Sequence, residues 1–102
     1  MLSPVHPGEI LNGELEELDL SVSELARKID VPTNRLSQII RGQRRVTADT
    51  ALRLGRWFGT GAQFWMNLQS NFDLACAADE LGDHINKIEP LHATEAAADL
   101  WL

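Results

Sequence analysis

Apolar residues recur along most of the chain three or four positions apart, and no stretch alternates apolar and polar residues as a half-buried strand does. The first apolar stripe, Leu11, Leu15 and Leu18, predicts a helix over about residues 7–18. Pro7 suits the first helical position, and Glu9 places a carboxylate in the first turn, where the helix dipole favours it.

Two short helices are predicted next. Ser21 and Glu24 have the S-x-x-E spacing of a capping box, so the second helix is expected to begin after Ser21. The segment 30–32, which contains Pro32, ends this helix. A third helix is expected over about residues 33–41, followed by Gly42 with a positive φ. The positions expected to face inward are Val22, Leu25, Ala26 and Ile29 in the second helix and Leu36, Ile39 and Ile40 in the third.

A fourth helix is expected between its N-cap, Thr47, and Gly59, and a second capping-box spacing, Thr60 to Gln63, predicts the start of a fifth. The large apolar residues of the fifth helix are Phe64, Trp65, Leu68 and Phe72. Beyond about residue 83 the pattern weakens, and residues 93–102 form either a short helix or a loose tail. The predicted class is all-α, with a domain over residues 5–72 and a helical extension over residues 73–102.

The segment 21–42 has the pattern of a helix-turn-helix unit. Two short helices joined by so short a turn cross at a steep angle, which requires a small residue such as Ala26 inside the first of them. The turn requires a residue that tolerates left-handed backbone geometry, and Asp30 tolerates it better than most. The alternative is an ordinary helical hairpin with a polar surface.

The outward face of the third helix is polar and contains no acidic residue. An α-helix fits the DNA major groove, where amide and guanidinium side chains can read base edges. The candidates for base reading are Thr33, Asn34, Arg35, Ser37 and Gln38, and the candidates for phosphate contact are Ser21, Ser23, Arg41, Arg44 and Arg45.

Charge is unevenly distributed along the chain. The 102 residues carry a net charge of −6, yet eight of the nine basic residues lie in residues 27–56, opposed there only by Asp30 and Asp49. That window therefore has a net charge of +6 and the remainder −12, which favours one surface for a polyanion and another for a basic partner. Charges that merely solvate surface helices are the alternative.

Composition narrows the class of protein. The length suits one domain, no apolar run approaches the roughly 18 residues of a membrane span, and the first residues do not have the pattern of an export signal. The single cysteine, Cys76, cannot form an intrachain disulfide, so we expect a reducing, cytoplasmic location. The three histidines have no metal-ligand spacing and no glycine-rich phosphate loop is present, so neither a cofactor nor an enzyme is expected.

Residues 21–60 resemble the five-helix, lambda-repressor-like family of DNA-binding domains. The opening HPGEILNGELEEL and the block FWMNLQ extend the resemblance to HigA-type antitoxins, over about residues 5–91. The resemblance implies a dimeric repressor of its own operator that also neutralises a HigB-type toxin, a small basic mRNA-cleaving ribonuclease. Val22 stands where the wider family often has a DNA-contacting Gln, so specificity is expected to rest more on residues 33–38.

Two further surfaces are candidates for protein partners. Glu14, Glu16 and Glu17 make the first helix acidic and are the expected toxin-binding residues, unless they only solvate the helix. Trp65, Leu68 and Phe72 are expected to form the interface of a homodimer, unless they belong to the core. Such a dimer would place two recognition helices about 34 Å apart, one turn of DNA.

Two alternatives to the antitoxin interpretation remain at this point. One is a stand-alone helix-turn-helix repressor without a toxin partner. The other is a protein-interaction adaptor that keeps the fold without binding DNA. The net charge of −6, which is unfavourable for a DNA-binding protein, is the reason to consider it.

Overall fold

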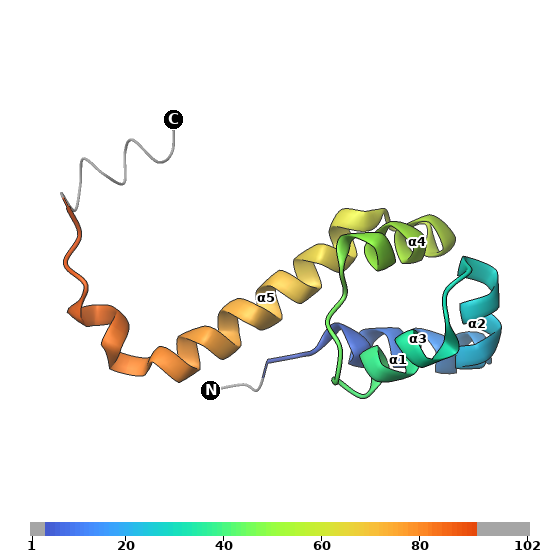
Figure 1. Ribbon diagram of the computed structural model, residues 1–102, viewed down its shortest axis with the longest axis horizontal. Coiled ribbons are helices and arrows are strands. Elements are labelled where there is room, and N and C mark those ends of the chain that lie inside the picture. Colours follow the sequence, from blue (N-terminus) through green and yellow to red (C-terminus); the bar gives the residue numbers. More distant parts are fainter. Residues whose placement is uncertain (1–3, 92–102) are drawn as a thin grey trace.

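The computed structural model describes residues 4–91 and shows five α-helices followed by a 3₁₀ turn (Figure 1). The helices are α1 (Pro7–Leu18), α2 (Val22–Ile29), α3 (Thr33–Ile40), α4 (Ala48–Phe58) and α5 (Ala62–Leu81), and the turn η1 is Gly82–Lys87. Residues 4–91 contain no strand, so the predicted five-helix, all-α class is confirmed. The prediction for residues 93–102 lies outside the described residues.

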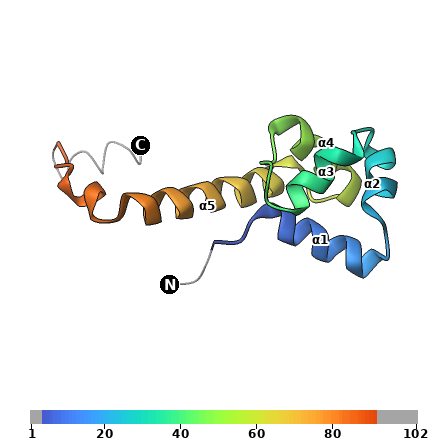
Figure 2. The same cartoon turned by 60° about the horizontal axis from the view of Figure 1, so that its bottom comes forward.

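The apolar faces of all five helices meet in one core. Its fully or almost fully buried side chains include Leu11, Leu25, Leu36, Ile39, Leu54 and Trp65. Burial of each such side chain contributes about 1.5–3 kcal/mol, so the amphipathic pattern is sufficient to bring these helices together. The four short helices and the first half of α5 form one body, from which the second half of α5 projects (Figures 1 and 2).

Two helices begin with a capping box. Ser21 Oγ accepts a hydrogen bond from the Glu24 N–H at 3.1 Å, and Glu24 Oε1 accepts one from the Ser21 N–H at 3.3 Å, which confirms the predicted cap of α2. At the start of α1, His6 Nδ1 accepts from the Gly8 N–H at 2.9 Å and Glu9 Oε2 accepts from the His6 N–H at 3.0 Å. Donors that the helix itself leaves unpaired are thus satisfied by side chains.

The capping box predicted at the start of α5 is wrong. The N-cap is Gly61, with φ 85°, and Thr60 Oγ1 instead donates to the Gly61 carbonyl at 3.0 Å. A Cβ atom on Gly55 of α4 would collide with the Gly61 backbone, which shows how closely this turn crosses α4. Backbone packing, rather than a side-chain cap, therefore determines where α5 begins. Thr47 is the N-cap of α4 as predicted, although its side chain makes no capping hydrogen bond.

The second half of α5 and the residues after it are mostly exposed. From Ser70 to Leu91 no residue is buried, and we call residues 74–91 the arm. The arm exposes five large apolar side chains, by 45–85% of their surface: Leu74, Leu81, Ile85, Ile88 and Leu91. An apolar surface of this extent on one projecting segment is typical of a protein–protein interface.

His6 makes the stability of the fold depend on pH. Burial lowers the pKa of His6, and its Nδ1 must be unprotonated to accept the Gly8 N–H, while the nearby Glu9 and Asp73 carboxylates act in the opposite direction. Because the folded state binds this proton less well than the unfolded state, stability is fully present above the ordinary pKa of about 6.5 and falls below it. We expect urea unfolding at pH 5.5 to have a lower midpoint than at pH 7.5. His6→Asn retains an N-cap acceptor without titrating and should reduce that difference; an unchanged difference would contradict the assignment to His6.

Candidate nucleic-acid interface

Helices α2 and α3 form the helix-turn-helix unit, joined through the turn at Asp30, Val31 and Pro32. Asp30 has φ 58° and ψ 54°, so an aspartate takes the left-handed turn position as the sequence predicted. Ala26 is 1% exposed at the crossing, and its carbonyl accepts a hydrogen bond from the Val31 N–H at 3.0 Å. The turn geometry is therefore fixed by backbone contacts and by the small side chain of Ala26.

The outward face of α3 is polar. Thr33 and Asn34 are exposed, Ser37 and Gln38 are half-buried, and the inward positions Leu36 and Ile39 are completely buried. These four polar residues are thus accessible on one helix, as base reading requires, and their roles stay predictions.

Arg35, the fifth candidate for base reading, is engaged by the protein itself. Its Nη1 donates to Asp49 Oδ2 at 2.9 Å, and the same oxygen accepts from Arg53 Nε at 3.1 Å. Arg53 also donates through Nη1 to the Ile29 carbonyl at 2.8 Å and to the Asp30 carbonyl at 3.1 Å. The hydrogen bond from Arg53, followed by that from Arg35, holds the pKa of the Asp49 carboxyl below its ordinary value.

The candidates for phosphate contact lie in two places. Arg41, Arg44 and Arg45 are exposed after the end of α3, where Gly42 has φ 74° as expected. Within residues 4–91, Arg41 and Arg44 form no ion pair, whereas Arg45 Nη2 lies 2.7 Å from Asp73 Oδ2. An ion pair this exposed contributes little to stability, so a phosphate can replace the carboxylate.

Ser21 and Ser23 lie exposed at the start of α2, with their hydroxyl oxygens 3.3 Å apart. Ser21 Oγ is already used as the helix cap. The hydrogen bonds with Ser21 lower the pKa of the Glu24 carboxyl below its ordinary value. The two serines stay predicted phosphate contacts.

Gln69 positions the loop between α3 and α4, and the sequence reasoning missed it. Its side chain is 1% exposed, accepts from the Val46 N–H at 2.7 Å and donates to Asp73 Oδ1 at 2.9 Å. Because Asp73 also pairs with Arg45, α5 holds the loop that carries the phosphate-contact arginines. The signal was present, since Gln69 lies one turn after Trp65 on the inward stripe of α5, where a polar residue requires a partner.

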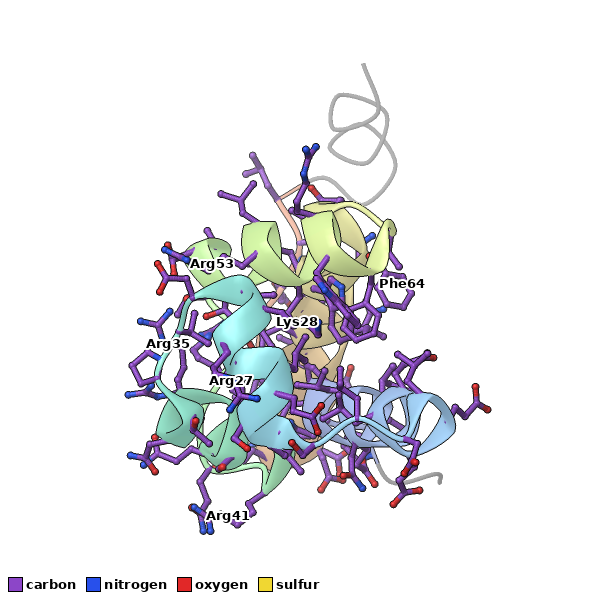
Figure 3. All side chains as sticks on the ribbon, turned by 90° about the vertical axis from the view of Figure 1, so that its right-hand side faces the viewer. Arg27, Lys28, Arg35, Arg41, Arg53 and Phe64 are labelled. Atoms are coloured by element: carbon purple, nitrogen blue, oxygen red, sulfur yellow. The ribbon has the colours of Figure 1, made fainter. Side chains whose placement is uncertain are left out.

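Three of the basic side chains labelled in Figure 3 lie on one side of the molecule. Arg35, Arg41 and Arg53 lie along the side opposite Phe64 (Figure 3). Helix α1, with its exposed acidic residues, extends toward the Phe64 side in the same view. These three arginines and the acidic helix α1 therefore lie on different sides of the molecule in this view.

Of the three predicted dimer residues, Trp65 is corrected by the structure. Its side chain is 1% exposed and packs against the rings of Phe58 and Phe64, so it belongs to the core and has no surface to offer a second chain. Leu68 and Phe72 are half-buried, and Phe72 lies edge-to-face with His6 at 4.9 Å between ring centroids. The apolar residues of the arm expose a larger fraction of their surface than Leu68 or Phe72 does. Their helical spacing could be seen in the sequence, but it did not suggest a role.

The predicted toxin-binding residues Glu14, Glu16 and Glu17 are all exposed on α1. A groove of about 530 Å³ between the end of α1 and the start of α2 is lined in part by Glu16, Asp19 and Glu24. The acidic surface is therefore continuous with a groove, which is a favourable shape for a basic partner.

Comparison with known proteins agrees with this geometry. The helix-turn-helix family profile matches residues 14–65. Virulence-associated protein I of Dichelobacter nodosus is 48% identical over 88 residues, which cover 85% of this chain and 81% of that protein. Among the described residues, no helix has the length and hydrophobicity to cross a membrane.

Two solved structures share the fold at high identity. Antitoxin HigA of Pseudomonas aeruginosa, solved with the higBA promoter, is 52% identical with a TM-score of 0.82, covering 87% of this chain and 99% of that one. A HigA-family addiction module antidote protein from Coxiella burnetii is 46% identical with a TM-score of 0.84 and the same coverage. The fold and the polar face of α3 thus define a helix-turn-helix protein of the DNA-binding class. The chain belongs to the helix-turn-helix family and, within it, to the HigA family.

Proposed function

We propose that the protein is the antitoxin of a toxin–antitoxin module, that it binds its own operator as a homodimer and represses transcription, and that it neutralises a HigB-type mRNA-cleaving toxin by direct binding. The observation that carries the proposal is the accessible, acid-free outer face of α3, followed directly by Arg41 and Arg44. The similarity to an antitoxin HigA solved with promoter DNA supports it. The protein is proposed to act by binding and not as an enzyme.

In the proposed complex, α3 enters the major groove of operator DNA. Thr33, Asn34, Ser37 and Gln38 read base edges, because their side chains can both donate and accept hydrogen bonds there. Arg41 and Arg44 contact phosphates with Ser21 and Ser23, and Arg45 joins them by exchanging Asp73 for a phosphate. The second subunit of the dimer places its own α3 one DNA turn away.

Gln38→Ala and Arg44→Ala are expected to have different effects on operator binding. Loss of a base contact at Gln38 should cost about 1–3 kcal/mol and relax preference at one base pair. Loss of a phosphate contact at Arg44 should weaken binding to all sequences and reduce the salt slope by about one. Gel-shift titrations of the gene's own promoter, its single-base variants and a scrambled duplex at several salt concentrations would measure both. Unchanged base preference in Gln38→Ala would contradict the base-reading role.

The toxin-binding half of the proposal rests on the acidic surface of α1. Replacing Glu14, Glu16 and Glu17 together by glutamine should weaken binding to the toxin encoded beside the gene at least tenfold, because a basic ribonuclease loses three attractive charges. Growth rescue on co-expression and calorimetric titration of the purified proteins would measure this, and operator binding should be retained. Replacing Asp79, Glu80 and Asp83 by their amides removes the same charge from the arm and is the matched control.

Two outcomes would contradict this part of the proposal. Equal loss in both triple variants would indicate a net-charge effect and argue against α1 as the binding surface. Operator binding without neutralisation of any adjacent toxin would instead favour a stand-alone repressor.

A further inference from the structure

A chain of charged side chains connects the helix-turn-helix turn to the recognition helix. Arg53 of α4 donates to the Ile29 carbonyl at the end of α2, to the Asp30 carbonyl in the turn and to Asp49. Asp49 also accepts from Arg35 of α3. Three separate elements are thus joined through one carboxylate oxygen.

Each member of this chain lies where helix electrostatics favour it. The carbonyls at the end of α2 have no partners within the helix, and the Arg53 guanidinium supplies both a donor and a positive charge there. Asp49 lies in the first turn of α4, where the helix dipole favours a carboxylate. Asp49 is consequently held in one orientation before any DNA arrives.

The position of Arg35 gives this arrangement a consequence for DNA binding. An unpaired arginine at the edge of the groove is attracted to any phosphate, whatever the sequence. When Arg35 is paired with Asp49, the two side chains together carry no net charge. The pair uses Nη1 of Arg35, and a guanidinium has five N–H donors in all. The remaining donors stay available, in a fixed orientation, for the two acceptors of a guanine edge.

We propose that Asp49 is a positioning residue that sets sequence specificity by acting through Arg35. It suppresses sequence-independent attraction of that arginine and aims it at a base edge. The inference rests on the proposed operator binding by α3. The side chains of Arg35 and Asp49 are 29% and 58% exposed, so the pair contributes little to stability and can be altered without unfolding the protein.

Asp49→Asn tests the proposal, because it removes the charge while keeping the size and one acceptor of the side chain. Affinity should be measured for a duplex of the gene's own promoter and for a scrambled duplex of equal composition. We expect scrambled-duplex affinity to rise several-fold, the salt slope to steepen by about one, and the ratio of the two affinities to fall about tenfold. Partial unfolding would lower both affinities equally and leave that ratio unchanged. Glu80→Gln, with the same charge change on the exposed arm, is the control and should preserve the ratio.

The second step uses Arg35→Ala as the background. If Asp49 acts through Arg35, the double variant Arg35→Ala, Asp49→Asn should have the same ratio of promoter to scrambled affinity as Arg35→Ala alone. A ratio in Asp49→Asn equal to the wild-type value, or an equal fall of the ratio in the Arg35→Ala background, would overturn the role of Asp49. Wild-type protein that fails to distinguish the promoter from the scrambled duplex would instead overturn the proposed operator binding, and this inference with it.

Discussion

If the proposed homodimer pairs through the arm, replacing Ile85 and Ile88 together by aspartate is expected to give a monomer and to weaken operator binding about a hundredfold or more. Ile85 is 50% and Ile88 68% exposed on the arm, so much of each apolar side chain is free to meet another protein surface. In a symmetric dimer the same apolar patch would meet its copy, and two charged residues at its centre would be left without water. A monomer engages one half-site at a time and loses the gain of roughly 10²–10⁴ that linked binding supplies.

Light scattering and gel-shift titration would measure this prediction, and thermal unfolding would show that the helix-turn-helix body is intact. Asn86→Asp adds an acidic residue to the same turn without removing apolar surface, so it should remain dimeric. A double variant that is still a dimer would exclude this part of the arm and return attention to Leu68 and Phe72.

The sequence was sufficient to predict the helices because the signals for them are local. The Ser21 capping box, the left-handed Asp30 and the positive φ of Gly42 each depend on a few neighbouring residues, and the structure confirms all three. The capping box predicted at Thr60 was wrong because Gly55 shapes the turn there. Gly55 precedes Thr60 by five residues and lies on α4, whereas the cap was predicted for α5. Contacts between elements are not encoded in the spacing within one element.

The same limit applies to the candidate site. The residues on the face of α3 could be chosen from their helical positions alone, and the structure leaves Asn34 and Gln38 accessible. The partners of Arg35 and Arg45, by contrast, are Asp49 and Asp73 on other helices, 14 and 28 positions away. The predicted boundary between a domain over residues 5–72 and a helical extension over residues 73–102 stays a prediction.

Gly8→Ala is expected to destabilise the protein by about 3 kcal/mol, a large part of the 5–15 kcal/mol typical of a domain. Gly8 lies in the first turn of α1 and is buried. A Cβ atom there would collide with the Ile39 carbonyl group and would lie 2.9 Å from the Ile40 Cα atom, and both are backbone atoms of α3 that a rotamer change cannot move. The helices must therefore separate, although alanine itself favours a helix by about 1 kcal/mol over glycine.

Gly13→Ala is the matched control, because it is the same substitution in the same helix with nothing within 4 Å of the added Cβ atom. It should stabilise the protein by about 0.5–1 kcal/mol, so that urea unfolding of the two variants shifts in opposite directions. Because α3 is one of the two helices that must separate, Gly8→Ala should also weaken operator binding under conditions where the protein stays folded. Equal shifts for both glycines would show that α1 and α3 can separate at little cost, and the fixed placement of the recognition helix would then need another cause.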